Sequence, residues 1–231
     1  MRKTCLNSIY ELAKINKKVI FIGSDLGPGV LDRMKIEMPN NFFMEGISEQ
    51  HIIGMAAGMA MDGLLPYVNT IATFLTRRCF EQIAIDLCLH DVPVKIIGNG
   101  GGLVYAPLGP THQSIEDIAI LRSLPNISIV APCDEVEMKK IMKETIDWPH
   151  PIYIRLAKGG DQIVTKKDEE IKIGRNVIFK EPNDLLIVST GIMTQVAINC
   201  AEKLSHEGID TGVLHAHTIK PFDFSAINNY L

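Results

Sequence analysis

Glu49 is the residue whose type and position give the clearest chemical signal in this sequence. It follows Ser48 and begins a run of small and apolar residues that extends to Met61. Such a run predicts a helix packed in the interior, so Glu49 is expected at the edge of a core, where a carboxylate is unfavourable unless something hydrogen-bonds it. Two interpretations stay open here: Glu49 belongs to a helix N-terminus capped by Ser48, or it is a catalytic acid.

A glycine-rich loop carries the second candidate. Gly98–Gly102 follows an apolar strand but does not lead into a helix, so a turn of close backbone approach is favoured over a phosphate-binding loop. The loop continues to His112, in the segment Gly109–Gln113. Ligands gather at the carboxyl ends of the strands in an open α/β sheet. His112 is therefore a candidate proton carrier or hydrogen-bond donor, with a structural loop residue as the alternative.

Two aromatic and two cationic side chains complete the candidates. Phe74, Arg77 and Phe80 lie at i, i+3 and i+6 on one face of a predicted helix, where they could wall a flat heteroaromatic ring. The alternative is a pair of core phenylalanines with an arginine that extends to solvent. Arg155 lies near the end of a predicted strand, where it could bind a phosphate or carboxylate, or pair with an acid.

Apolar runs of strand length alternate with amphipathic helical patterns over residues 1–160. Continuous runs of Val and Ile between helices are typical of a parallel sheet covered on both faces, so the predicted fold class is α/β with a doubly wound parallel sheet. The predicted strands are Val19–Gly23, Pro66–Asn69, Val94–Gly98, Ile127–Val130 and Ile152–Arg155. The predicted helices are Cys5–Ile15, Glu49–Met61, Leu75–Leu89, Ile115–Leu121 and Glu135–Ile146.

The pattern changes after residue 160. Residues 161–183 are predicted as a polar linker that could hold a hairpin near Ile171–Phe179, and residues 184–231 as a partial second α/β domain. The predicted elements of that domain are a strand at Leu185–Ser189, a helix at Met193–Ser205 and a strand at Thr211–Leu214. One β-α-β unit cannot cover both faces of its own sheet. Exposed apolar faces are therefore expected at Leu185–Ser189 and Val213–Leu214.

Composition narrows the class of protein. The chain of 231 residues is 46% hydrophobic, enough for a large core, while its net charge of −4 and the lack of a basic run argue against nucleic acids and acidic membrane surfaces as partners. No apolar run reaches the roughly 20 residues of a membrane helix, and no signal peptide opens the chain. The five cysteines are scattered and never form a C-x-x-C pair. They predict reduced, buried thiols in a cytoplasmic protein, with no metal ligands and no disulfides.

Taken together, five motifs resemble the pyrimidine-binding domain of transketolase and of 1-deoxy-D-xylulose-5-phosphate synthase. They occur in the order and spacing of that family within about residues 1–158, and the segment from Asp184 resembles the start of the family's C-terminal domain. The motifs are Gly23-Ser24-Asp25-Leu26, Gly46-Ile47-Ser48-Glu49-Gln50-His51, Thr73-Phe74-Leu75 with Arg77, Gly109-Pro110-Thr111-His112-Gln113, and Ile154-Arg155.

The resemblance implies a thiamine diphosphate enzyme that transfers a two-carbon ketol unit between sugar phosphates or related sugars. In this family the glutamate at the Glu49 position hydrogen-bonds the aminopyrimidine ring of the cofactor. The residue at the Phe74 position stacks on that ring, and Arg77 and Phe80 fall at neighbouring positions of the pocket. His112 matches a histidine near the substrate oxygens.

The resemblance also implies how substrate phosphate is held, and the departures from it matter as much. Arg155 matches a phosphate-binding arginine, and Arg2 falls at the spacing of a second one. Three departures concern substrate contacts: Gly29 replaces a phosphate-binding serine, Asn99 or Gly100 stands near a substrate-binding histidine, and Leu108 replaces an acid that contacts the acceptor. A sugar or keto acid other than the standard pentose phosphates is therefore expected.

The family's diphosphate and Mg²⁺ site, a Gly-Asp-Gly motif followed by an asparagine, has no counterpart in this sequence. A companion chain with that domain is therefore expected to hold the metal and complete the site, in a heterotetramer or a homodimer of halves, as in split transketolases. The alternatives within enzymes are a 1-deoxy-D-xylulose-5-phosphate synthase-like activity and the beta subunit of a 2-oxoacid dehydrogenase, of which Phe74 with Arg77 favours the first. Outside enzymes, the alternative is a scaffold or regulator that has lost activity.

Overall fold

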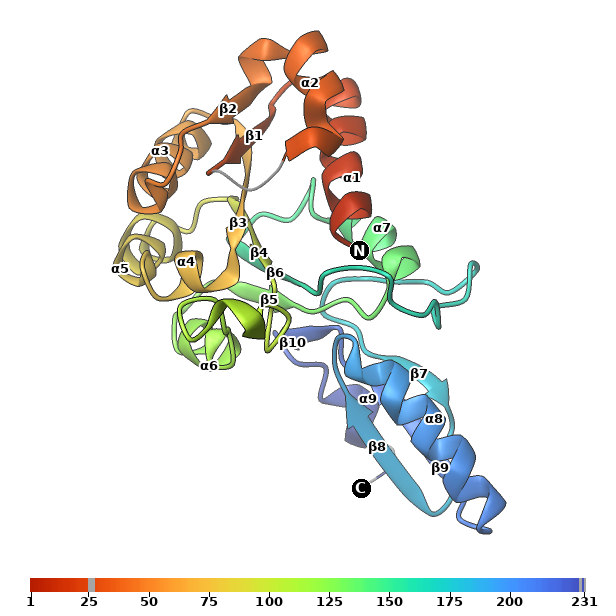
Figure 1. Ribbon diagram of the computed structural model, residues 1–231. Coiled ribbons are helices and arrows are strands. Elements are labelled where there is room, and N and C mark those ends of the chain that lie inside the picture. Colours follow the sequence, from red (N-terminus) through yellow and green to blue (C-terminus); the bar gives the residue numbers. More distant parts are fainter. Residues whose placement is uncertain (25–27, 229, 231) are drawn as a thin grey trace.

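The computed structural model describes residues 1–24, 28–228 and 230, and it contains two sheets of unequal size (Figure 1). The larger sheet has seven strands in the order β10-β5-β6-β4-β3-β1-β2, and every neighbouring pair runs parallel except β10 with β5. Its strands are β1 (Val19–Gly23), β2 (Phe42–Met44), β3 (Leu65–Ile71), β4 (Lys95–Asn99), β5 (Ser128–Val130), β6 (Ile152–Leu156) and β10 (Thr218–Lys220).

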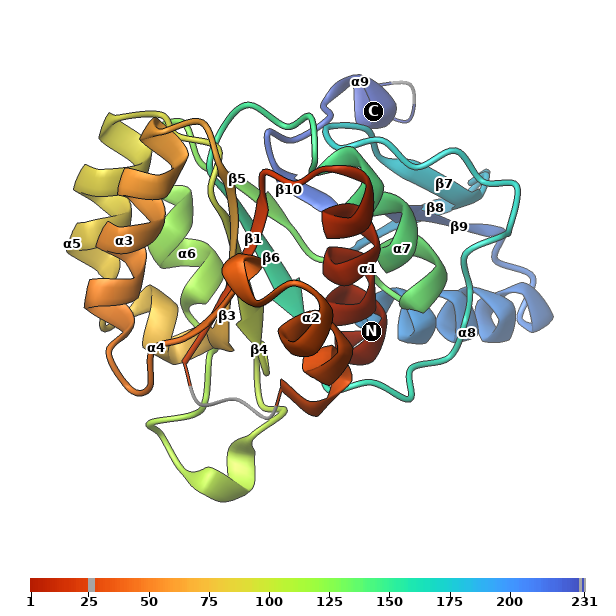
Figure 2. The same ribbon diagram turned by 90° about the horizontal axis from the view of Figure 1, so that it is seen from above.

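Helices cover both faces of this sheet (Figure 2). One face carries α1 (Arg2–Ile15), α2 (Asp32–Glu37) and α7 (Glu135–Glu144), and the other carries α3 (Glu49–Met61), α4 (Ala72–Thr76), α5 (Phe80–Gln82) and α6 (Asp117–Arg122). Short helical turns are η1 (Pro28–Leu31), η2 (Pro39–Asn41), η4 (Ala106–Leu108) and the π-helical η3 (Ile83–Leu89). All five residues of β1 and of β4 are buried, because both faces are covered. The predicted doubly wound parallel sheet is confirmed.

The helix predicted at Leu75–Leu89 is wrong as a single element, because the chain breaks between α4 and α5. Side chains compete with the helical backbone there: the Thr76 hydroxyl donates to the Ala72 carbonyl, and the Cys79 thiol to the Phe74 carbonyl. Gln50 of α3 also donates a side-chain hydrogen bond to the backbone of this turn. The break turns Arg77 and Arg78 in different directions, which matters for the site.

The smaller sheet has the order β7-β9-β8 and lies beside the first domain (Figure 1). Its elements are β7 (Val177–Lys180), β8 (Leu185–Ser189), α8 (Met193–His206), β9 (Thr211–His215) and, at the end of the chain, α9 (Ser225–Asn228). The hairpin considered near Ile171–Phe179 is wrong: β7 lies in the segment predicted as a linker, and it pairs antiparallel with β9, far along the chain. After β9 the chain returns to the larger sheet as β10.

The expected exposure of the smaller sheet is confirmed on one strand and wrong on the other. Leu185 and Val188 of β8 are each 46% exposed, whereas Val213 and Leu214 are buried. The difference arises because β8 is an edge strand, while β9 is the central strand and has neighbours on both sides.

The prediction of buried cysteines is confirmed for four of the five, but Cys200 on α8 is exposed. Among the described residues, no helix has the length and apolarity needed to span a bilayer.

Lys95 at the start of β4 supports a pH-dependent prediction. Its side chain is fully buried, its Nζ donates to the Pro93 carbonyl at 2.8 Å, and burial lowers its pKa from 10.5 to about 8. Between these values the unfolded chain binds more protons than the folded one, so this group's contribution to stability rises with pH. Lys95→Met is expected to raise the free energy of unfolding by about 3 kcal/mol at pH 7.

Urea unfolding at several pH values measures this effect. The gain from Lys95→Met is expected to shrink as the pH rises from 8 towards 10, because the native lysine then becomes neutral without cost. The exposed Lys17→Met is the control, with no pH-dependent gain. A constant gain at all pH values would show that packing, and not the buried charge, is responsible.

Candidate functional site

Glu49 begins α3 and is 1% exposed. Its Oε2 accepts a hydrogen bond from Nη1 of Arg78 at 2.5 Å, while its Oε1 is buried and has no partner among the described residues. An acceptor left in this state is unfavourable unless a bound group or water satisfies it. The burial of Glu49 expected from the apolar helix is therefore confirmed, and one carboxylate oxygen is free to accept a hydrogen bond.

The capping role considered for Ser48 is wrong. Ser48 occupies the position before α3, but its hydroxyl donates to the Glu45 carbonyl at 2.7 Å, and it makes no side-chain bond to the helix. The turn that precedes the helix thus holds the hydroxyl away from the α3 amides. Asp134, by contrast, caps α7 by accepting from the amides of Val136 and Glu137.

Arg78 links Glu49 to Phe74, and Phe74 in turn contacts His112. The Arg78 guanidinium, which is bonded to Glu49, lies 4.3 Å from the centroid of the Phe74 ring, a cation–π contact. On the same ring, His112 makes an edge contact with 5.1 Å between centroids, and its Nδ1 lies 2.9 Å from the Thr111 hydroxyl. The structure therefore groups an acid, an aromatic ring and an imidazole from three separate segments of the chain.

Arg77 fastens the loop that carries His112. Its guanidinium donates to the carbonyls of Pro110 and Gln113, each at 2.8 Å, and forms an ion pair with Glu116. The hydrogen bond from Arg77 lowers the pKa of the Glu116 carboxyl below its usual value. Since these contacts engage both sides of the guanidinium, Arg77 positions the His112 loop in this structure.

Removal of the Arg77 side chain is expected to make the loop that carries His112 open more often. Arg77→Ala is expected to speed amide hydrogen exchange across residues 109–114 roughly tenfold, because three bonds of about 0.5 kcal/mol each are lost. Global stability is expected to fall by a similar amount, about 1.5 kcal/mol at most, since Arg77 is partly exposed. Arg122→Ala, an exposed arginine at the end of α6, is the control. Unchanged exchange in the loop would contradict the positioning role.

The other predicted site residues lie in two places. Phe80 is 37% exposed and lines a hollow with residues of α4 and α6. Arg2 starts α1 beside the loop that leaves β6, where the Met1 amino group lies 4.0 Å from Asp161, and it has no ion pair among the described residues. The continuous helix that would align Phe80 with Phe74 is interrupted, so only Phe74 of this pair contacts Arg78 and His112.

Arg155 is held by a buried acid. Its Nε donates to Oδ2 of Asp117 at 2.8 Å, and the Tyr153 hydroxyl donates to the same oxygen at 2.8 Å. Burial and this carboxylate raise the pKa of Tyr153 well above its usual value. The arginine also lies against Gly101, where an added Cβ would come within 2.6 Å of the guanidinium. The close approach predicted for the glycine-rich loop is confirmed.

Sequence reasoning missed two groups. Arg78 was not considered, although it lies one turn from Phe74. The other group is Asn69 and Thr70, buried polar side chains near the carboxyl end of β3, which hydrogen-bond Asn99 and Ser24, two residues that the sequence analysis had named. A polar residue directly after an apolar run was the available signal. Asp25 and Leu26, part of one motif, lie outside the described residues.

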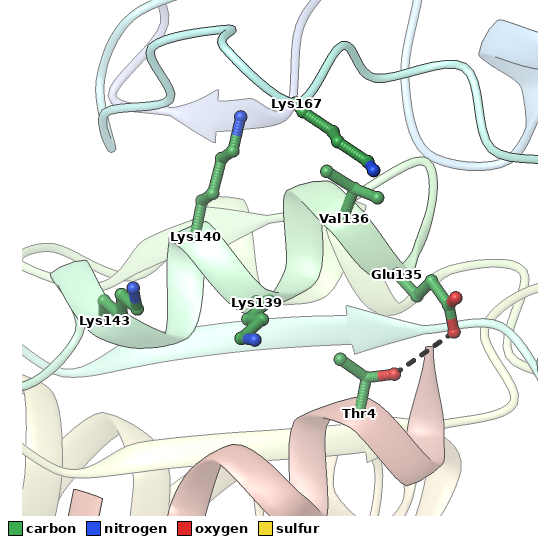
Figure 3. Close-up of a pocket in the computed structure, with 7 residues that line it drawn as sticks. All are labelled: Thr4, Glu135, Val136, Lys139, Lys140, Lys143 and Lys167. Atoms are coloured by element: carbon green, nitrogen blue, oxygen red, sulfur yellow. Dashed lines mark hydrogen bonds between the residues drawn. The ribbon is translucent and has the colours of Figure 1, made fainter. Parts of the chain in front are cut away.

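A basic hollow on α7 is unrelated to these groups. Lys139, Lys140, Lys143 and Lys167 line it, together with Thr4, Glu135 and Val136 (Figure 3). Lys140 already donates to the carbonyls of Lys166 and Glu169. The four ammonium groups do not converge on one point in Figure 3, so the hollow is not shaped as an anion site.

Comparison with known proteins identifies the family. The model of the transketolase pyrimidine-binding domain matches residues 1–160, and that of the transketolase C-terminal domain matches residues 174–231. The chain belongs to the transketolase family. The resemblance inferred from the motifs is thereby confirmed, and so is the pyrimidine-binding type of its first domain.

Several relatives align over nearly all of the chain. One of them, a subunit of the apulose-4-phosphate transketolase of Phocaeicola vulgatus, is 35% identical over 98% of the chain and 73% of that protein. A 1-deoxy-D-xylulose-5-phosphate synthase of Trichormus variabilis is also 35% identical, over 97% of the chain but only 36% of that protein. Among solved structures, a split-gene transketolase, described as an inactive beta4 tetramer, matches with a TM-score of 0.90 and 33% identity over 99% of the chain and 74% of that structure.

Proposed function

We propose that this transketolase-family chain is the pyrimidine-binding subunit of a split thiamine diphosphate enzyme. It transfers a two-carbon ketol unit between sugars or sugar phosphates, and a companion chain supplies the diphosphate and Mg²⁺ domain. The observation that carries the proposal is Glu49, a buried carboxylate with one oxygen unpartnered at the family's catalytic position. The scattered, unpaired cysteines support a reducing, cytoplasmic location.

The residues present fit the pyrimidine end of the cofactor. Oε1 of Glu49 can accept a hydrogen bond from a ring nitrogen, and Phe74 offers a partly exposed aromatic face. Arg78 now covers the Phe74 ring, so its side chain must move for another ring to stack there. When bound, thiamine diphosphate supplies an electron sink for the two-carbon unit.

The other residues of this chain act on substrate in the proposal. His112, half-buried and fixed by the loop that Arg77 holds, donates a hydrogen bond or a proton to a sugar oxygen. Arg155 donates from Nε to Asp117 and from Nη2 to the Ser114 carbonyl, which leaves Nη1 to contact a phosphate. Phe80 and Arg2 stay in the proposal as more distant cofactor-pocket and phosphate contacts.

A companion chain is the central requirement of the proposal. The Phocaeicola vulgatus relative, which is one subunit of its transketolase, and the split-gene structure support an enzyme divided between chains. The lone chain should bind thiamine diphosphate weakly, because it lacks a Gly-Asp-Gly…Asn segment. Calorimetry with the lone chain and with the assembled pair, both with Mg²⁺, measures this difference.

The decisive experiment mixes the purified chain with its companion, thiamine diphosphate and Mg²⁺. The donor panel holds standard ketose phosphates, apulose 4-phosphate and 6-deoxy-6-sulfo-D-fructose, the last two taken from the names of relatives. Leu108, which is 59% exposed where the family has an acid, favours a donor and acceptor pair outside the standard pentose phosphates. No ketol transfer from any donor would contradict the proposal.

A 1-deoxy-D-xylulose-5-phosphate synthase activity is the second candidate, because relatives with that name match at the same 35% identity. The same assembled enzyme distinguishes the two candidates. Formation of 1-deoxy-D-xylulose 5-phosphate, without ketol transfer between sugars, would favour the synthase.

A further inference from the structure

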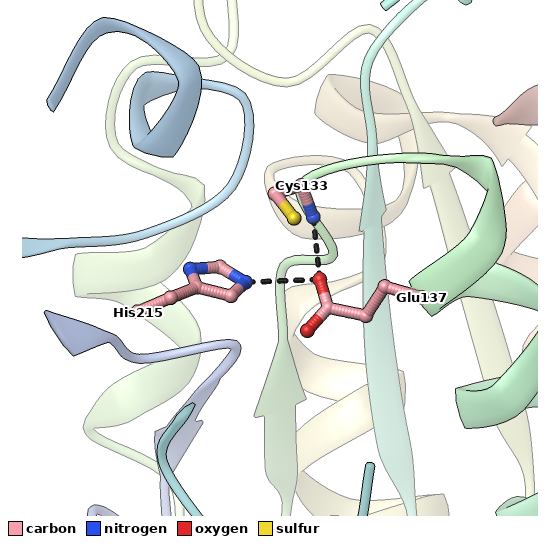
Figure 4. Close-up of side chains that lie close together, drawn as sticks. All are labelled: Cys133, Glu137 and His215. Atoms are coloured by element: carbon pink, nitrogen blue, oxygen red, sulfur yellow. Dashed lines mark hydrogen bonds and ion pairs between the residues drawn. The ribbon is translucent and has the colours of Figure 1, made fainter. Parts of the chain in front are cut away.

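A cluster of metal-binding side chain types lies at the contact between the two sheets. Cys133 lies just before α7, Glu137 is in the first turn of α7, and His215 comes from the end of β9 (Figure 4). All three are fully buried, and one ligand atom from each lies within 4.8 Å of the others. None of them takes part in the proposed ketol transfer.

The hydrogen bonds of this cluster leave two buried atoms unsatisfied. Oε2 of Glu137 accepts from the Cys133 amide at 2.7 Å and lies 2.9 Å from Nε2 of His215. Oε1 of Glu137 has no partner among the described residues, and neither does Nε2 of His217, whose ring centroid lies 5.9 Å from that of His215. Unpartnered polar atoms in a buried cluster indicate a network that a further group completes.

Both histidines are oriented in the way that metal ligands are. Nδ1 of His215 lies 2.7 Å from the Thr194 hydroxyl, and Nδ1 of His217 lies 2.9 Å from the Thr218 hydroxyl. Where each Nδ1 donates, Nε2 carries a lone pair, and for His215 this lone pair faces Glu137; such outer partners commonly fix ligating histidines. For His215 this tautomer sets two acceptors, Nε2 and the Glu137 carboxylate, 2.9 Å apart, an arrangement that a cation between them stabilises.

We propose that Cys133, Glu137 and His215 bind one divalent transition-metal ion of the zinc class, with Nε2 of His217 best placed among the described residues to complete the set. Sulfur, nitrogen and carboxylate oxygen are the ligands that Zn²⁺ takes, and four of them form a tetrahedral site. Ligands of such a site lie about 3.5 Å apart, so metal binding would widen the 2.9 Å separation between Nε2 of His215 and Oε2 of Glu137 and would shorten any separation near the 4.8 Å limit. The ion would join α7 of the first domain to β9 of the second.

Nothing in the sequence indicated this site, because its ligands are not neighbours in the chain. Glu137 and His215 are 78 positions apart, and the cysteine has no C-x-x-C partner. Only the return of the chain to the first domain brings them together. The expectation that the chain lacks metal ligands rested on spacing alone.

Cobalt and zinc titration of the full chain, stripped of metal by a chelator, tests the proposal. One Co²⁺ per chain is expected to bind and to give a thiolate-to-metal absorption band, which added Zn²⁺ removes. Cys133→Ala is expected to abolish the band, whereas Cys200→Ala, which removes the exposed cysteine of α8, keeps it. His215→Gln is expected to weaken binding by about 100-fold or more.

Thermal unfolding provides the second readout and guards against misfolding. Zn²⁺ should raise the midpoint of the native chain and of Cys200→Ala in a concentration-dependent way, but not that of Cys133→Ser, which keeps the size of the side chain. Folded protein that binds no Co²⁺, or that shows the same zinc effect in Cys133→Ser, would overturn the proposal. The cluster would then be a buried His215–Glu137 ion pair. Neither readout depends on the companion chain, so failure here leaves the proposed enzyme function untouched.

Discussion

Glu49→Gln is expected to reduce the activity of the assembled enzyme by about 10²–10⁴-fold at saturating thiamine diphosphate. The amide keeps the size of the side chain and can still accept the hydrogen bond from Arg78, but it cannot take the negative charge or share a proton. The loss should therefore appear in kcat, with the chain folded and the assembly intact. Steady-state kinetics, with size-exclusion chromatography of the same sample, measure both.

Glu144→Gln is the matched control for this substitution, since Glu144 is exposed at the end of α7. It should leave kcat unchanged. Activity of Glu49→Gln within threefold of the native enzyme would remove Glu49 from the chemistry and favour the scaffold or regulator considered from the sequence.

Asp117→Ala is expected to lower the free energy of unfolding by about 3–5 kcal/mol, the largest stability effect that we predict for a single side chain. Asp117 is 1% exposed and accepts from both the Tyr153 hydroxyl and the Arg155 guanidinium. Alanine leaves a buried hydroxyl and a mostly buried cation without their acceptor. Urea denaturation at pH 7 measures the change through the midpoint at constant slope.

Two further variants separate charge from packing at this position. Asp117→Asn keeps an acceptor oxygen and is expected to cost about 1–2 kcal/mol. A double-mutant cycle with Tyr153→Phe should give a coupling energy of about 1 kcal/mol. Asp62→Asn, at an exposed position after α3, should change stability by less than about 0.5 kcal/mol. If Asp117→Ala changed the free energy of unfolding as little as Asp62→Asn does, the buried network around Asp117 would not contribute to stability.

Local pattern was enough for most of the first domain. Apolar runs predicted β1, and their alternation with helices predicted the doubly wound sheet, because a strand covered on both faces has no polar side to present. Small residues placed α3 correctly, from Glu49 to Met61. The three-residue strands β2 and β10 were missed because such short runs show no period, whereas β5 lies within the longer apolar run Ile127–Val130.

The type and position of the candidate acid were also readable from the sequence, since a carboxylate at the start of an apolar helix is buried by that helix. Its partners were not. Arg78 reaches Glu49 only because side-chain hydrogen bonds break the helix after α4, and Arg77 holds the His112 loop for the same reason. Such competition between side chain and backbone depends on neighbours that periodicity does not contain.

By itself, the sequence determined the fold class, the longer strands of the larger sheet and the acid at position 49, because these follow from local apolar pattern and residue type. Only the tertiary structure decided which side chains meet: Arg78 with Glu49, Asp117 with Arg155, and Glu137 with His215. These pairs join segments 29 to 78 positions apart. Their geometry is set by the packing of helices and sheets, which no short window of sequence records.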